Sequence, residues 1–113
     1  MKPTVIDNPS ASRFEILVED RVVGYAEYRR DGATVALTHT SIDPEFEGRG
    51  LGSTLARHAL TAIRDQGASV LPFCPFIRGY IQRHPEYLQL VPPDARGRFR
   101  LTSPATEQDS RGH

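Results

Sequence analysis

Three glycines and one arginine lie close together in the segment EFEGRGLGSTL, residues 45–55, just before apolar residues that recur at helical spacing. Glycines between a strand and a helix let backbone N–H groups turn outward, because no Cβ lies in the way. The start of the helix adds the positive end of its dipole, which favours phosphate. The residues of this candidate pyrophosphate cradle are Gly48, Gly50 and Gly52, the N–H groups of Leu51 and Ser53, and the Arg49 cation. The alternative is a tight loop that only caps a helix.

The spacing around the glycines excludes two common nucleotide sites. A P-loop ends in Lys followed by Ser or Thr, and this segment does not. A dinucleotide-binding fold needs a parallel βαβ unit early in the chain, whereas antiparallel strands are expected before Gly48. A phosphate ligand of another kind is therefore needed.

Cys74 is the only cysteine of the chain and the most interesting side chain for chemistry. Pro75 favours extended backbone at position 74 and suits the first position of a helix. Cys74 is therefore predicted to be a helix N-cap, where the dipole stabilises a thiolate. The alternative is a buried structural thiol, the usual state of a lone intracellular cysteine.

His39 lies between Thr38 and Thr40 on a predicted strand. An imidazole is a competent general base at cellular pH, so His39 is a candidate for deprotonating a nucleophile. The alternative is a strand histidine that is hydrogen-bonded across the sheet.

The elements that position these residues follow from the period of the apolar residues. Phe14, Ile16 and Val18 alternate with more polar residues, as in a half-buried strand, and Asp31-Gly32 is typical of a hairpin turn. After residue 51 the apolar period changes to four, which predicts an amphipathic helix that ends near Gly67. The predicted strands span residues 14–18, 22–30, 33–42 and 69–73, and the predicted helices span residues 51–67 and 75–83. The expected fold class is α/β of the α+β type, with a mainly antiparallel sheet and two flanking helices.

A chain of 113 residues has room for one domain. Residues 1–12 are expected to form a flexible lead, residues 13–91 the folded domain, and residues 92–113 a polar, disordered tail. Within that tail, Phe99 and Leu101 are large apolar residues that would suit one more short strand.

The composition excludes several classes of function. The 14 basic and 14 acidic residues cancel, which argues against a nucleic-acid binder or a protein held to a membrane by a basic field. A single cysteine allows no intramolecular disulfide and no Cys-rich zinc site, and no metal is expected. No segment has the ~20 apolar residues of a membrane span, and a cytoplasmic location is expected.

The runs THTSIDPEFEGRGLGSTLARHAL and LPFCPFIRGYIQRHPEYLQLV together resemble a compact branch of the GNAT superfamily of N-acetyltransferases. The resemblance covers roughly residues 14–91, and its more specific parts are the Cys74-Pro75 pair and the Arg-His-Pro-Glu-Tyr run at residues 83–87. In that superfamily a loop of the form Arg/Gln-x-x-Gly-x-Gly/Ala binds the pyrophosphate of acetyl-coenzyme A. The loop corresponds here to residues 47–52.

The resemblance implies a fold in which the strand at residues 33–42 splays from the strand at residues 69–73, with the pantetheine arm in the gap. Backbone groups of the splayed strand would then polarise the thioester carbonyl, and Cys74 would face the thioester at the end of the gap. Cys74 is expected either to carry the acetyl group transiently or to line the donor pocket, and Tyr80 to protonate the leaving thiolate. Tyr80 has an alternative as a core residue beside Ile77 and Ile81. The residues expected to bind acetyl-coenzyme A are Ile42, Glu47, Gly48, Arg49, Gly50, Leu51, Gly52 and Ser53.

This chain departs from the superfamily pattern at two positions. Glu47 stands where Arg or Gln is usual, and Ser41 stands where members of the small branch often carry a glutamate. His39 is expected to replace that missing carboxylate as the base.

Two functions follow from these residues. The first is transfer of an acetyl group from acetyl-coenzyme A to an amine, either of a small molecule or of a protein. The second is a non-catalytic module that binds acyl-coenzyme A or another protein on the same fold. Cys74 and His39 favour the first, and Glu47 and Ser41 favour the second. The sequence identifies neither the acceptor nor the oligomeric state.

Overall fold

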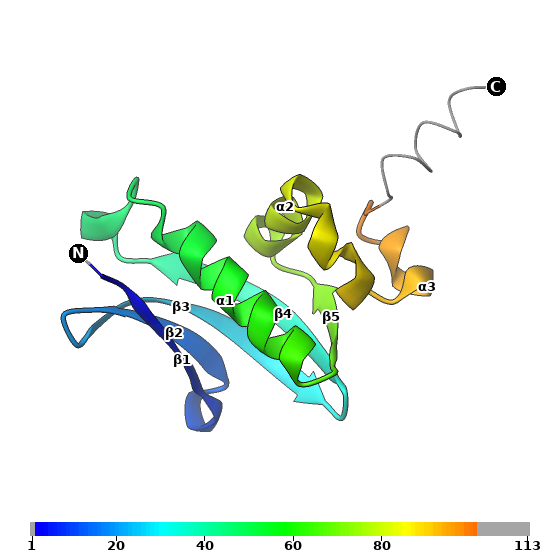
Figure 1. Cartoon of the computed structure of the whole chain (residues 1–113), viewed down its shortest axis with the longest axis horizontal. Helices are drawn as coiled ribbons and strands as arrows, with labels where there is room; N and C mark the ends of the chain where they lie inside the picture. Colours follow the sequence, from blue (N-terminus) through cyan, green and yellow to red (C-terminus); the bar gives the residue numbers. More distant parts are fainter. Residues whose placement is uncertain (1, 102–113) are drawn as a thin grey trace.

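A five-stranded sheet with helices on one face forms the centre of the computed structural model, which describes residues 2–101 (Figure 1). The order of the strands across the sheet is their order in the chain, and the first four strands are antiparallel to one another. The last strand, β5, runs parallel to β4. The strands are β1 (Thr4–Asn8), β2 (Arg13–Val18), β3 (Arg21–Asp31), β4 (Thr34–Ile42) and β5 (Ser69–Pro72). The predicted α/β class with a mainly antiparallel sheet is confirmed.

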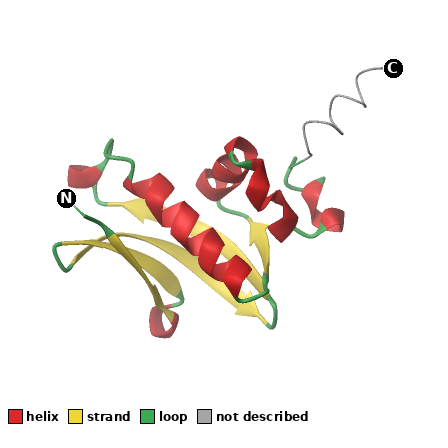
Figure 2. Ribbon diagram, in the orientation of Figure 1, coloured by secondary structure: helices red, strands yellow, loops and turns green. Residues whose placement is uncertain are grey.

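Helix α1 (Leu51–Asp65) lies diagonally across the sheet, and Figure 2 shows α2 beside it. The four-residue stripe of α1 is buried as its period predicts, with Leu51 3% exposed and Leu55, Ala59 and Ile63 fully buried. Each fully buried Leu or Ile side chain contributes about 1.5–3 kcal/mol relative to an exposed one, so this stripe anchors α1 on the sheet. The other helical elements are α2 (Pro75–Arg83), α3 (Pro93–Arg96) and the short 3-10 helices η1 (Pro9–Ala11), η2 (Pro44–Phe46) and η3 (Pro85–Leu90).

The beginning of the chain differs from the expected flexible lead over residues 1–12. Residues 4–8 form β1, which pairs with β2 from Thr4 opposite Leu17 to Asn8 opposite Arg13. A hydrogen bond from the Tyr28 hydroxyl to Asp7 Oδ1, 2.7 Å long, holds the strand on the sheet. Because β1 is mostly exposed, its sequence lacks the apolar alternation that reveals a strand.

The end of the chain also differs from the expected tail. Within residues 92–101 the structure has helix α3, and both Phe99 and Leu101 are buried. The additional strand suggested for these two residues is not present, because the Leu101 N–H bonds to the carbonyl of Arg96 in a local turn. The rest of the predicted tail, residues 102–113, lies outside the described residues.

A β-bulge divides β4 into two halves. Odd-numbered residues face the core before the bulge, and even-numbered residues face it after the bulge. Leu37 pairs with Tyr28, but the next pair joins His39 with Glu27, so Thr38 is an additional residue on β4. An additional residue reverses which side chains face the core. Thr40 therefore points to the α1 face, and His39 points to the outer face.

The central strands splay as predicted. Pairing of β4 with β5 runs from Thr34 opposite Ser69 to Leu37 opposite Pro72. The Cys74 N–H then bonds to the Leu37 carbonyl at 2.9 Å, after which the chain turns into α2. Residues 38–42 continue along β3 alone, which opens a gap at the end of the sheet where the glycine segment lies.

Candidate functional site

A cavity of about 390 Å³ lies where the splayed end of β4, the glycine segment and the starts of α1 and α2 meet. The glycine segment and the start of α1 contribute Glu47, Gly48, Gly50, Leu51, Gly52 and Ser53 to its lining. The remaining walls are Thr40, Ile42, Phe46 and Phe76. The structure thus brings together around one cavity every residue predicted to bind the coenzyme except Arg49.

Two of the three glycines are explained by the backbone. Gly48 has φ 81° and Gly50 has φ 75°, both in the left-handed region that side chains with a Cβ rarely adopt. Gly50 is the N-cap of α1, and its carbonyl accepts the Thr54 N–H at 3.1 Å. The first N–H groups of a helix have no partner within the helix, so the start of α1 presents donors to the cavity.

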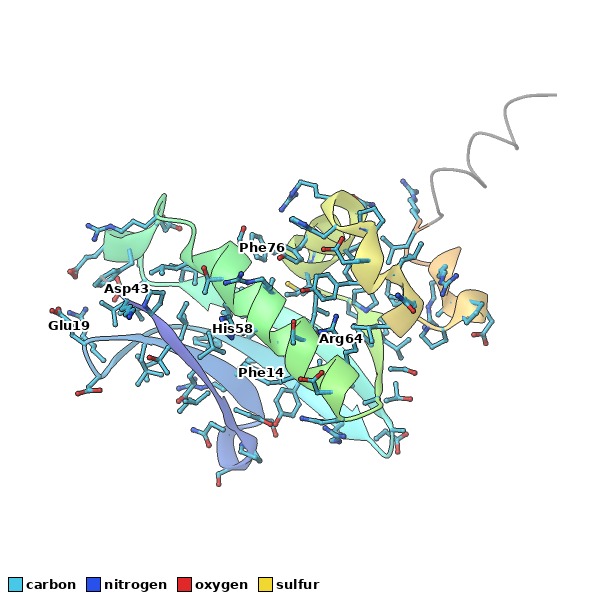
Figure 3. All side chains as sticks on the ribbon, viewed as in Figure 1. Phe14, Glu19, Asp43, His58, Arg64 and Phe76 are labelled. Atoms are coloured by element: carbon cyan, nitrogen blue, oxygen red, sulfur yellow. The ribbon has the colours of Figure 1, made fainter. Side chains whose placement is uncertain are left out.

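Gly52 is explained by a contact instead of by its backbone. A Cβ at this position would lie 2.8 Å from Phe76 Cζ, closer than real Cβ contacts allow. The Phe76 ring, at the start of α2, therefore rests directly on the first turn of α1. Figure 3 shows Phe76 between these two helices.

The charged side chains around the cavity have opposite signs and opposite effects on a bound anion. Glu47 is exposed and lines the cavity, where its carboxylate disfavours an anion. The Arg49 guanidinium lies over the Phe46 ring, 5.3 Å from its centroid, and Arg21 lies 5.6 Å from the same ring. Backbone N–H groups and the dipole of α1 add positive potential at this cavity to that of the two guanidinium groups over Phe46.

Cys74 is the N-cap of α2, as its position before Pro75 predicted, and it is 3% exposed. Its Sγ lies 3.3 Å from Thr40 Oγ1, and either atom can be the donor. Thr40 also lines the cavity, so it connects the thiol with the cavity wall. The sequence did not single out Thr40 as a site residue, because simple alternation from Leu37 places it on the outer face.

His39 lies on the outer face of the sheet, exposed and away from the cavity. Its ring centroid is 6.1 Å from that of Tyr25, and the Arg13 guanidinium covers the same tyrosine at 4.6 Å. Arg13 Nε also donates to Glu15 Oε2 at 2.8 Å, which lowers the pKa of that carboxyl. The structure thus separates His39 from the coenzyme residues, since they lie on opposite faces of the sheet.

Tyr80 packs in the core and does not line the cavity. Its ring stacks on His84 with centroids 4.2 Å apart and tilts against Tyr87 at 5.9 Å. Burial raises the pKa of the Tyr80 phenol, with the nearby Tyr87 adding to the effect. The Tyr87 hydroxyl in turn lies 3.3 Å from Thr61 Oγ1 on α1, which ties η3 to that helix.

The order and geometry of these elements agree with a known family. A family model described as GCN5-related N-acetyl-transferase matches residues 13–91. The chain belongs to this N-acetyltransferase family. The resemblance recognised in its motifs is thereby confirmed, and the matched range ends at Val91, just after η3.

Solved structures of this N-acetyltransferase fold match the chain as well. A GCN5-like protein from Staphylococcus aureus is 19% identical, with a TM-score of 0.61, and the match covers 79% of this chain and 87% of that protein. The ribosomal-protein-S18-alanine N-acetyltransferase from Escherichia coli is 18% identical, with a TM-score of 0.50. That match covers 53% of this chain and only 39% of the E. coli enzyme, so these likenesses show the fold alone. A search of curated protein sequences gave no match.

Two further features of the described residues bear on function. Residues 2–101 include no helix that is long and apolar enough to cross a membrane. Within the same range, no three or more His, Cys, Asp or Glu side chains gather in a way that would hold a metal ion.

Proposed function

We propose that the protein transfers an acetyl group from acetyl-coenzyme A to an amine. The observation that carries this proposal is one cavity that combines the backbone donors at the start of α1 with an apolar wall. The lining residue Thr40 connects this cavity with the buried thiol of Cys74 behind it, at the splay of the sheet. Membership of the N-acetyltransferase family supports the reaction class. The identity of the amine is a separate question for experiment.

The donor would bind along the cavity from its polar end to its apolar end. The pyrophosphate would accept hydrogen bonds from the N–H groups of Leu51, Gly52 and Ser53, which the helix dipole strengthens. The pantetheine arm would then lie against Ile42 and Phe76 toward the gap between β4 and β5. This placement brings the thioester toward Thr40, because Thr40 lies on the same face of β4 as Ile42.

Cys74 would contribute in one of two ways. In the covalent version, its sulfur bonds to the thioester carbon while the bond from that carbon to the coenzyme sulfur breaks, and the coenzyme leaves as a thiol with the proton of Cys74. The amine then attacks the acetyl-cysteine, loses one proton and restores the thiol. In the other version, Cys74 only lines the donor pocket and the amine attacks the thioester directly. Thr40, 3.3 Å from the sulfur, is placed to orient the thiol in both versions.

The proposed roles of His39 and Tyr80 depend on where the acceptor binds. His39 lies on the outer face, so it would deprotonate an amine that reaches the gap from that face. Tyr80 lies in the core, so a role as the acid would require access to the leaving sulfur through the start of α2.

The alternative function, a non-catalytic module that binds acyl-coenzyme A or a protein, is favoured by one observation. Glu47 lines the cavity in the position where the superfamily usually has Arg or Gln. Its carboxylate would weaken binding of a dianion, and a module without turnover tolerates the absence of a carboxylate at Ser41.

Calorimetric titration with acetyl-coenzyme A and desulfo-coenzyme A tests the proposal first. Desulfo-coenzyme A lacks the thiol, so it measures pyrophosphate and pantetheine binding without acyl chemistry. Saturable binding of both, followed by release of coenzyme A in the presence of a panel of amines, is the expected outcome. Binding without turnover on any amine of the panel would favour the non-catalytic module, and absence of binding would contradict the coenzyme site.

A further inference from the structure

The glycine segment contains two kinds of glycine, and the structure distinguishes them. At Gly48 and Gly50 a Cβ would meet no other atom within 4 Å, and only the left-handed backbone requires glycine. At Gly52 the backbone is helical, and the obstacle is the ring of Phe76, with Cζ at 2.8 Å and Cε2 at 3.4 Å. Glycine at position 52 is therefore required by the contact with a side chain on another helix.

Phe76 is held in place from both sides of its backbone. Pro75 fixes the φ angle at the first position of α2, and Cys74 is bonded through its N–H to Leu37 on β4. The Phe76 ring is 39% exposed although it contacts α1, because its other face lines the cavity with Ile42 and Phe46. A half-exposed aromatic ring that lies against α1 beside the proposed pyrophosphate site is suited to an apolar ligand segment.

We propose that Phe76 forms the wall on which the pantetheine arm of the coenzyme lies, and that residue 52 is glycine in order to seat that ring. A Cβ at position 52 would push the ring outward into the cavity and narrow the path of the arm. The inference rests on the proposed coenzyme function and adds to it the residue pair that sets the width of the donor channel.

A double-mutant cycle separates this role from a direct role of Gly52 at the phosphate. The variants are Gly52→Ala, Phe76→Ala and the double variant, and the ligands are acetyl-coenzyme A and 3′-phosphoadenosine 5′-diphosphate, which ends at the pyrophosphate. We expect each single variant to weaken acetyl-coenzyme A about tenfold and the nucleotide fragment less than about twofold. The double variant should bind acetyl-coenzyme A no more weakly than Phe76→Ala alone.

Thermal unfolding without ligand measures the contact between position 52 and the Phe76 ring directly. Alanine is the better helix former, so Gly52→Ala should raise the melting temperature when Phe76 is absent and lower it when the ring is present. Gly79→Ala on α2 is the matched control, because its Cβ would meet only the flexible end of Arg83 at 3.4 Å. It should not lower the melting temperature in either background.

Two results would overturn the inference, and they are distinguishable. If Gly52→Ala weakens the nucleotide fragment as much as acetyl-coenzyme A, and Phe76→Ala does not remove the effect, then Gly52 serves the phosphate directly. If the wild-type protein binds neither ligand, the coenzyme function fails and the channel with it, whereas the unfolding data would still report whether Gly52 seats the ring.

Discussion

Two helices begin at the same cavity, and their first residues differ in almost every respect. Helix α1 follows Gly48 and Gly50, and its start presents backbone donors with few side chains around them. Helix α2 starts with Cys74, Pro75 and Phe76, which supply a thiol, a residue without an N–H, and an aromatic ring. Both starts carry the same dipole, so only their side chains decide what each can bind.

In the proposed function, the start of α1 binds the coenzyme anion because side chains are absent from it. Proline at the first position of α2 removes one donor from that helix start. The start of α1 keeps its donors accessible because two left-handed glycines lead into it. The proposed mechanism accordingly assigns charge recognition to α1 and the acyl chemistry to α2.

Removing the thiol at the start of α2 tests that assignment with the largest expected effect. In the covalent version, Cys74→Ser should lower acetyl transfer on the order of 1000-fold and leave acetyl-coenzyme A affinity unchanged, since the cradle is intact. Mass spectrometry of the wild-type protein after mixing with acetyl-coenzyme A should detect one added acetyl group, absent from the variant. Thr40→Val removes the hydroxyl beside Sγ and keeps the thiol, so it should still take up the acetyl group and lose less turnover than Cys74→Ser. Full transfer by Cys74→Ser would leave α2 with the pocket-lining role alone.

The next test concerns His39, which lies on the outer face of the sheet, away from both helix starts. His39→Gln should lower turnover about 100-fold, the size expected for loss of a general base, with unchanged affinity for acetyl-coenzyme A. Ser41→Ala, the next outward residue on β4, should have little effect. Steady-state kinetics over a range of pH would measure both variants, and equal turnover of His39→Gln and the wild type would remove the base role.

A Cβ at the start of α1 should weaken coenzyme binding without acting on the chemistry. We expect Gly50→Ala to reduce affinity about tenfold or more, because the left-handed backbone at φ 75° is strained with a side chain and the donors shift. Gly32→Ala is the control, since Gly32 has φ 60° in the β3–β4 turn and open space around it. Both variants should lose about 1–2 kcal/mol of unfolding free energy, and only Gly50→Ala should lose affinity. Equal affinity of Gly50→Ala and the wild type would show that the start of α1 is a capped helix and no more.

The smallest effect is expected for Tyr80, which lies further along α2. A Tyr80 variant tests whether residues beyond the start of α2 take part in acetyl transfer. Because Tyr80 stacks on His84 in the core, Tyr80→Phe should keep turnover within about threefold of the wild type, well below the loss expected for a general acid. A fall of 100-fold would instead establish Tyr80 as the acid that protonates the leaving sulfur.

The pH dependence of unfolding reports the core role of the same residue. Burial raises the pKa of Tyr80, so the folded state holds the phenol proton more tightly than the unfolded state. The resulting stability is complete below about pH 10 and is lost as the pH rises toward the folded pKa. Urea unfolding should therefore show a smaller alkaline loss for Tyr80→Phe than for the wild type. Tyr28, whose pKa burial and Asp7 raise to about 12, should behave in the same way in Tyr28→Phe.

Much of the fold was predictable from patterns that span a few residues. The alternation at residues 14–18 and the four-residue stripe of α1 are buried as their periods indicated. Pro75 correctly marked the start of α2 and the N-cap at Cys74, because proline restricts its own backbone and that of the residue before it. These signals are local, so the sequence by itself determined β2 to β5, α1, α2 and the family, but neither β1 nor α3.

The tertiary structure decided which side chains meet. The sequence treated the three glycines alike, but Gly52 is small because of a ring that lies on another helix. It proposed His39 as a base on the splayed strand, and only the structure shows that one additional residue on β4 turns His39 outward and Thr40 inward. It assigned residues 1–12 to a flexible lead, whereas residues 4–8 pair with β2. Such contacts join residues that are distant in the chain, and local period and backbone preference carry no information about them.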